Sequence, residues 1–325
     1  MSMQLTRREM IARTGICVGA AAAPAGASVS AAEKPASGPA SEPFGYCLNM
    51  GTIMGHKLSL AEEVEVAAQA GWQGVEPWIR NVRRFVDDGG SLGDLRKRVD
   101  DLGLRVVSAI GFTRWAVDDD AERAQGLEQF REEMDLVAQL GGTHIAASPA
   151  GINRTPGMDL ANIAERYRAV LELGRQAGVI PQLEIWGSAQ TLGTVAEAAY
   201  VACRADHPDA CLLLDAFHIY RGGSGFECLK LLSGAKMHAF HVNDYPDDPP
   251  REEINDSHRV YPGDGVCPLS SVLRTLYDTG FRGMLSLELF NRDYWKQDAL
   301  TVAKTGLAKT RAAVAGALAQ GPTRG

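Results

Sequence analysis

Four consecutive apolar runs in the second half of the sequence each carry an acidic or imidazole side chain. These are Glu184 in QLEIW, Asp215 in CLLLD, His241 in HAFHV and Glu288 in MLSLEL. Three carboxylates packed closely would repel one another, and at least one would stay protonated unless a cation joined them. Carboxylate oxygens with one imidazole suit Mn²⁺, Mg²⁺, Co²⁺ or Zn²⁺. The four residues therefore predict a site for one divalent metal, with Mn²⁺ as the first expectation.

Such a site could move a proton next to a carbonyl group. A divalent ion chelated by a hydroxyketone polarises the carbonyl and lowers the pKa of the adjacent C–H. Glu184 and Glu288 belong to the outer two of the four runs, so they can lie on opposite sides of the ion. One carboxylate would remove the proton and the other could return one. Return to the same carbon gives epimerisation, return to the neighbouring carbon gives isomerisation, and loss of a β-oxygen gives elimination. The sequence leaves these three outcomes open.

Further candidates lie near the ends of the apolar runs. Glu76 lies in GVEPW and is a candidate for substrate binding, and Trp186 follows Glu184 by two positions. Tryptophan near a strand end could stack on a sugar ring or pack in the core. His144 stands at the start of its run, which predicts a structural role.

The spacing of the runs predicts an α/β fold, a single-domain (β/α)8 TIM barrel. Eight short apolar runs alternate with amphipathic stretches over about 270 residues, as this barrel requires. The runs are 44–50, 74–78, 105–110, 144–148, 182–186, 211–215, 238–242 and 284–289, and helical patterns occur at 59–71, 126–141, 160–178 and 194–206. A doubly wound sheet is the alternative, but no GxGxxG follows the first run. Barrel active sites form at the carboxyl ends of the strands, where the candidate residues fall.

The N-terminal segment predicts export from the cytoplasm. Arg7 and Arg8 precede a short apolar stretch, and small residues follow it. This layout is typical of a twin-arginine signal peptide, and the apolar stretch is too short for a stable membrane span. We therefore expect a periplasmic or otherwise exported protein, although an uncleaved anchor stays open as an alternative. The expected organisation is a signal peptide, a linker, the barrel and a flexible tail, at 1–32, 33–43, 44–315 and 316–325.

Composition favours a small-molecule partner. The chain has 325 residues and a formal net charge of −7, which argues against nucleic-acid binding. No Gly-rich phosphate loop is present, and Lys and Arg do not cluster near the last two runs beyond Arg259. We therefore expect a non-phosphorylated sugar as the partner, with assembly into a homo-oligomer left open.

Five motifs resemble the xylose-isomerase-like TIM-barrel superfamily of sugar isomerases and epimerases, and the similarity covers residues 44–312. The motifs are LEIWG, LLLDAFHIY, FHVND, HRVYPGDG and SLELFN. In the ketose 3-epimerases, motifs of this shape supply four metal ligands, which fall here on Glu184, Asp215, His241 and Glu288. The resemblance also implies that the two glutamates form the catalytic acid/base pair. His218 and Arg259 would bind substrate oxygens.

Two features depart from the ketose 3-epimerase pattern. Gln190 stands where those enzymes commonly have a glutamate, six positions past the first ligand, and we keep it as a candidate substrate-binding residue. An additional acidic, Pro-rich segment, DYPDDPPREEINDSH, occupies residues 244–258. Both departures bear on the substrate more than on the metal.

The combined expectation is a metal-dependent isomerase or epimerase that abstracts a proton next to a metal-bound carbonyl. Its substrate would be a non-phosphorylated ketose, inosose or sugar acid. A metal-dependent lyase or dehydratase acting on a keto-sugar or 3-keto-glycoside is the alternative. A noncatalytic sugar-binding subunit is a third reading.

Overall fold

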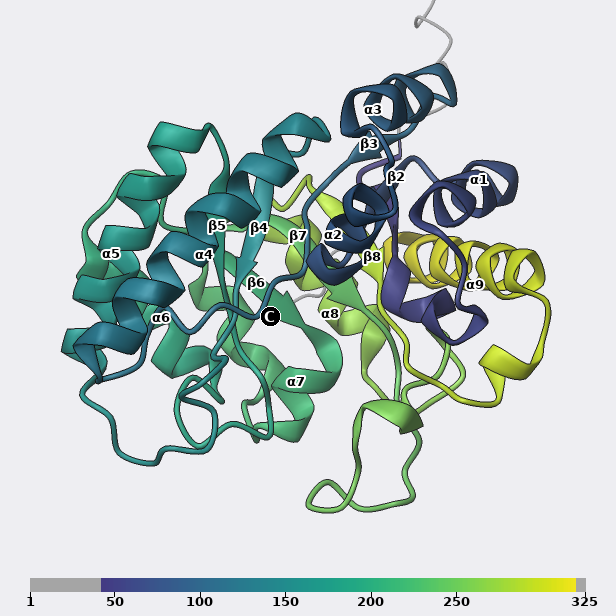
Figure 1. Ribbon diagram of the computed structural model, residues 1–325. Coiled ribbons are helices and arrows are strands. Elements are labelled where there is room, and N and C mark those ends of the chain that lie inside the picture. Colours follow the sequence, from purple (N-terminus) through teal and green to yellow (C-terminus); the bar gives the residue numbers. More distant parts are fainter. Residues whose placement is uncertain (1–41, 320–325) are drawn as a thin grey trace, which may run out of the picture. The chain divides into compact units, whose positions relative to one another are not determined.

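Eight parallel strands make one sheet in the order β3-β2-β1-β8-β7-β6-β5-β4 (Figure 1). Their bounds in the computed structural model are β1 Gly45–Asn49, β2 Gly74–Glu76, β3 Arg105–Val106, β4 His144–Ala147, β5 Ile180–Glu184, β6 Leu212–Asp215, β7 Met237–Val242 and β8 Met284–Leu287. The two ends of this order meet just after β3. The Ala109 N–H donates to the His144 carbonyl (3.1 Å), and the Ala146 N–H donates to the Ala109 carbonyl (2.9 Å). The sheet therefore closes on itself, and the predicted TIM barrel is confirmed.

The structure describes residues 42–319, which form one compact unit. The predicted signal peptide, all but the last two residues of the predicted linker and residues 320–325 of the predicted tail lie outside the described residues. Among the helices of residues 42–319, none is both long enough and apolar enough to span a membrane.

Nine α-helices of this part of the chain surround the strands (Figure 1). They are α1 Leu60–Ala70, α2 Ile79–Asp87, α3 Leu92–Asp101, α4 Asp120–Gln139, α5 Leu160–Ala177, α6 Val195–Ala205, α7 Ala216–Arg221, α8 Leu269–Asp278 and α9 Ala299–Ala319. Side-chain caps fix several starts: Ser59 and Glu62 form a capping box at α1, which ends at Gly71 with φ +90°. Asp119 accepts from the Glu122 N–H, so α4 begins six residues before the predicted 126–141 pattern. At the other end, α9 includes residues 316–319, which the sequence had assigned to the tail.

The strands explain the continuous apolar runs. Leu213, Leu214 and Leu285 are fully buried, because barrel strands pack against the interior on one face and against helices on the other. Each such side chain contributes roughly 1.5–3 kcal/mol by leaving water. A polar residue at a strand end interrupts this pattern only where the strand reaches the rim.

Strand register brings the candidate residues together at that rim. Asp215 pairs with His241 across β6 and β7, and His241 pairs with Ser286 across β7 and β8. On the other side of β8, Asn49 pairs with Glu76 across β1 and β2. Strand pairing thus brings residues that are far apart in the sequence into one cluster.

Candidate metal and substrate site

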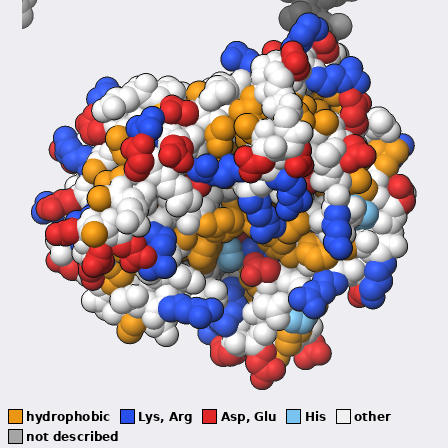
Figure 2. All heavy atoms as spheres, in the orientation of Figure 1, with side chains coloured by type: hydrophobic (Ala, Val, Ile, Leu, Met, Phe, Trp, Pro, Cys, Tyr) orange, Lys and Arg blue, Asp and Glu red, His pale blue; other side chains and the backbone are white. Residues whose placement is uncertain are grey.

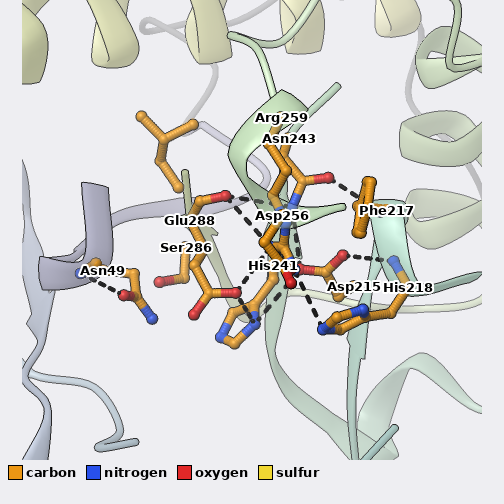
Figure 3. A network of polar contacts seen from close by, with 12 residues as sticks. Asn49, Asp215, Phe217, His218, His241, Asn243, Asp256, Arg259, Ser286 and Glu288 are labelled. Atoms are coloured by element: carbon orange, nitrogen blue, oxygen red, sulfur yellow. Dashed lines mark hydrogen bonds and ion pairs between the residues drawn. The ribbon is translucent and has the colours of Figure 1, made fainter. Parts of the chain in front are cut away.

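Asp215, His241 and Glu288 form a buried cluster at the carboxyl ends of β6, β7 and β8 (Figure 3). One ligand atom from each lies within 4.8 Å of the others. His241 Nδ1 lies 3.3 Å from Glu288 Oε2 and 3.7 Å from Asp215 Oδ2. Two carboxylates and one imidazole at these distances make a donor set suited to a divalent cation.

Glu76 lies behind His241 and fixes its orientation. Its Oε2 lies 2.9 Å from His241 Nε2 and also accepts from Asn49 Nδ2 (2.8 Å) and Ser286 Oγ (2.7 Å). Burial opposes ionisation of Glu76, but His241 and the two other donors outweigh it and lower its pKa. Because a carboxylate oxygen only accepts, His241 Nε2 carries a proton and Nδ1 faces the other two carboxylates. This is the carboxylate–histidine arrangement that commonly supports a metal-binding imidazole.

The protonation of His241 bears on cation binding. Burial opposes protonation, but Glu288 and Glu76 outweigh it and raise the pKa of His241 well above its usual range. A metal ligand must be the neutral imidazole, so a cation would displace the Nδ1 proton and bind more weakly at low pH.

Arg259 supplies a positive charge to the same cluster. Its Nη1 donates to Asp215 Oδ2 (2.8 Å) and to Glu288 Oε2 (2.9 Å). The side chain is only 1% exposed and packs over the ring of Phe217 at 4.7 Å. The guanidinium contacts one oxygen of each carboxylate. The other oxygen of Asp215 accepts from the His218 N–H (2.8 Å) and keeps a further lone pair, so Arg259 does not use up the donors that a metal needs.

Glu184 ends β5 and faces the same cavity as Glu288, but it is not part of the three-residue cluster. It is 4% exposed, and its Oε2 has no hydrogen-bond partner within residues 42–319. Burial and the neighbouring Glu288 raise the pKa of Glu184 to about 8. A buried carboxylate without a partner is costly, and a cation at the adjacent cluster would offset that cost. Asp215, His241 and Glu288 thus suit a divalent ion, and Glu184 faces the same cavity beside them.

A cavity of about 210 Å³ opens beside this cluster. Its lining is Trp78, Ile110, Phe112, Glu184, Trp186, Ser188, His218, Asp256, Arg259, Glu288 and Phe290. Trp78 contacts both Phe112 and Phe290, at ring-centroid distances of 5.1 and 5.8 Å, and Phe112 lies 5.8 Å from Trp186. Figure 2 shows a hollow on this face where hydrophobic, acidic, basic and histidine side chains meet. One side of the cavity is therefore aromatic and the other is charged.

Two cavities of about 500 Å³ lie elsewhere and hold none of the candidate residues. One is lined largely by apolar residues of α6 and of the segment around Leu231, and the other lies against α8 and α9. Of these three cavities of the described residues, the smaller one is the better candidate site, because it lies beside the cluster that could hold a metal and is lined by titratable groups.

The predicted site residues do not all reach the cavity. His218, Arg259 and Trp186 line it, as their predicted substrate contacts require. Gln190 is exposed and does not line it; it lies in the turn that the Trp186 N–H closes by donating to the Leu192 carbonyl.

Two residues differ from the sequence-based interpretation. Glu76 is completely buried and contacts His241 instead of the cavity. Asp256 lines the cavity and was not predicted. The only sequence signal for Asp256 was its place in the additional acidic segment.

Comparisons with known proteins support this fold. The family model described as xylose isomerase-like TIM barrel matches residues 64–313. An inosose isomerase of Bacillus velezensis is 26% identical over 273 residues, which cover 82% of this chain and 96% of that protein. A 3-dehydroshikimate dehydratase of Pseudomonas aeruginosa is 28% identical over 241 residues, covering 72% of this chain and 36% of the dehydratase.

A solved structure, the IOLI protein with a bound zinc atom, superposes with a TM-score of 0.78 at 23% identity. The match covers 85% of this chain and all of that one. The family model covers more than half of the chain and agrees with the observed barrel, so the chain belongs to the xylose isomerase-like TIM barrel family.

Proposed function

We propose that this protein is a divalent-metal-dependent sugar isomerase or epimerase that moves a proton at a carbon next to a carbonyl group. The observation that carries the proposal is the presence of Glu184 and Glu288 in one cavity, beside the cluster of Asp215 and His241. The proposed substrate is a non-phosphorylated ketose, inosose or sugar acid. Similarity to inosose isomerases supports a cyclic ketone among these.

Asp215, His241, Glu288 and Glu184 would hold the metal. When bound, it would supply the Lewis acidity that makes the C–H next to a ketone acidic enough to lose its proton. Mn²⁺ remains our first expectation, and the zinc in the similar solved structure makes Zn²⁺ the principal alternative.

The protein's own side chains would do the remaining work. Glu184 and Glu288 would remove a proton from carbon and return one, as a base and acid on the two sides of the substrate. His218 Nε2 lies 3.2 Å from Arg259 Nη2, and because arginine only donates, the His218 proton is on Nδ1. Burial lowers the pKa of His218, so the ring is neutral near pH 7. Its Nδ1–H has no partner among the described residues, and we assign it to a substrate oxygen.

A dehydratase or other lyase is the second candidate, acting on a keto-sugar or 3-keto-glycoside. Similarity to 3-dehydroshikimate dehydratases favours it. Proton removal next to the ketone is the same first step, and the outcome changes when the β-oxygen leaves before a proton returns. A third possibility, a noncatalytic sugar-binding subunit, would give neither reaction.

Reaction in D₂O separates these candidates. Metal-reconstituted protein is incubated with an inosose, ketoses, a 3-keto-glycoside and 3-dehydroshikimate, and products are analysed by NMR and mass spectrometry. An isomerase or epimerase should place deuterium at the carbon next to the carbonyl, and Glu184→Gln should slow this by ~10²–10⁴-fold. Loss of the β-oxygen would identify the lyase instead. No turnover and no isotope exchange with any of these substrates would refute both enzymatic proposals.

We also propose that the protein works outside the cytoplasm, on the basis of the paired arginines in its N-terminal segment. This segment lies outside the described residues, so the proposal rests on the sequence alone.

A further inference from the structure

The additional acidic segment is an anchored loop that forms part of the cavity wall. We call residues 245–258, the extended loop at the bottom of Figure 1, the cavity loop. Its base is closed by paired backbone hydrogen bonds between Asp244 and Val260. Toward the C-terminal end of the loop, Ile254 is 1% exposed, and its carbonyl accepts from Arg221 Nε at 3.1 Å. These contacts give the cavity loop a fixed course past the site.

Asp256 is the acidic residue that the cavity loop presents to the site. It begins the 3-10 turn Asp256–His258, where the Asn255 side chain caps the turn. Its Oδ1 accepts from Arg259 Nη2 at 2.6 Å. The Asp256 side chain nevertheless remains 52% exposed, whereas that of Arg259 is 1% exposed. The carboxylate thus holds the arginine and still offers acceptor capacity to a ligand in the cavity.

Asp256 is ionised at neutral pH. Partial burial opposes its ionisation, but the positive charge of Arg259 outweighs this and lowers the pKa of Asp256. An ionised carboxylate only accepts hydrogen bonds, so it suits a substrate hydroxyl and repels a second anion.

The cavity offers no spare cation to an anionic substrate. Among the described residues that line it, Arg259 is the only Lys or Arg. Its Nη1 is engaged by Asp215 and Glu288, its Nη2 by Asp256 and His218, and its Nε is buried. A phosphate or carboxylate at this end of the cavity would therefore meet Asp256 without a compensating partner.

We propose that Asp256 determines specificity: it accepts a hydrogen bond from a hydroxyl of a neutral polyol ketone and excludes ketones that carry a phosphate or carboxylate at that end. The aromatic side of the cavity, which includes Trp78 and Phe290, would contact the C–H face of such a ring. This proposal rests on the proposed function and narrows its substrate class, because a sugar acid would be disfavoured.

The test compares two cyclic ketones of similar size, an inosose and 3-dehydroshikimate, because only the second carries a carboxylate. Their dissociation constants are measured by calorimetry on metal-loaded wild type and Asp256→Asn, which keeps an acceptor for Arg259 but removes the charge. The wild type should prefer the inosose. In the variant, inosose affinity should fall about 10-fold, as expected for loss of a charged hydrogen bond, and affinity for the anion should rise about 10-fold.

Two controls separate specificity from structural damage. Asp256→Glu keeps the charge and should retain the preference for the neutral ketone. Glu252→Gln removes a charge from the same loop at a side chain that is 71% exposed and paired with Arg251, and should change neither affinity.

Two results would overturn the inference alone: an unchanged affinity ratio in Asp256→Asn, or an equal loss for both ketones, which would mean that Asp256 only positions Arg259. A wild type that binds neither ketone and catalyses no deuterium exchange would instead overturn the proposed function, and this inference with it. A wild type that prefers the anionic ketone would refute the assignment of Asp256 while leaving proton-transfer chemistry intact.

Discussion

Glu76→Gln should weaken metal binding without disrupting the barrel. The side chain is fully buried, and one oxygen accepts from His241, Asn49 and Ser286. Glutamine has the same shape, and its amide oxygen can accept the same three hydrogen bonds. The substitution removes the negative charge of the Glu76 carboxylate. In the wild type this charge supports the Nε2–H of His241 and makes the imidazole a stronger metal ligand.

The expected size follows from the type of hydrogen bond lost. A hydrogen bond to a charged group contributes about 1.5–3 kcal/mol and one between neutral groups about 0.5–1.5 kcal/mol, so the difference is roughly 1–1.5 kcal/mol. This corresponds to about a 10-fold rise in the metal dissociation constant. Substitutions of residues that support a metal ligand typically cost 10–100-fold, and we expect Glu76→Gln within that range.

The assay is calorimetric titration of metal-free protein with Mn²⁺ and with Zn²⁺, with circular dichroism to verify folding. Ser286→Ala is the matched control, because it removes one donor to Glu76 but leaves the His241 contact, and its effect should be clearly smaller. A folded Glu76→Gln protein that binds both metals within about twofold of the wild type would refute the positioning role of Glu76.

Three further predictions concern metal content, stability and export. Reconstituted wild type should carry roughly one metal ion per chain by elemental analysis, and Asp215→Asn should carry far less; chelation should abolish activity, and a metal-free active enzyme would contradict the site. Burial raises the pKa of Glu63 in the folded state to about 7. Between the pKa of this group in the unfolded chain and that value, the folded state keeps a proton that the unfolded state has released. The free energy of unfolding therefore falls as pH rises through this range. In denaturant titrations, Glu63→Gln should therefore raise the free energy of unfolding by about 1–3 kcal/mol at pH 8 and have little effect at pH 4. A larger stabilisation at pH 4 than at pH 8 would contradict this. Replacing Arg7 and Arg8 with lysine should retain a reporter fusion in the cytoplasm, whereas unchanged export would exclude the twin-arginine route.

The sequence predicted the elements of the barrel well because their signals are local. A strand buried on both faces must be apolar along its length, so a carboxylate at its end, such as Asp215, indicates the rim. The same reasoning placed His241 beside it, and the register of β6 and β7 confirms the pairing. Helix starts were less accurate, since the cap at Asp119 lies outside the apolar pattern that predicted α4.

Contacts that depend on distant segments could not be predicted. Glu76 and His241 are 165 residues apart, and whether Glu76 faces the cavity or the back of the imidazole depends on strand pleat and barrel closure. Gln190 had the spacing of a family residue, but the turn after Trp186 directs it to solvent. The contact between Asp256 and Arg259 depends on the conformation of the cavity loop, which no periodic pattern encodes.

Arg259 links the charge balance of the metal cluster to the specificity of the cavity. Its two terminal nitrogens face different groups: Nη1 contacts Asp215 and Glu288, while Nη2 contacts Asp256. Because the guanidinium is rigid and planar, the Nη1 contacts hold it in place even when the partner of Nη2 loses its charge. Asp256→Asn should therefore alter the preference between neutral and anionic ligands while leaving metal affinity nearly unchanged. Glu76→Gln should do the opposite, since Glu76 contacts His241 of the metal cluster and does not line the cavity. Opposite responses of metal and ligand affinity in these two variants would separate the metal-supporting side of the site from its substrate-selecting side.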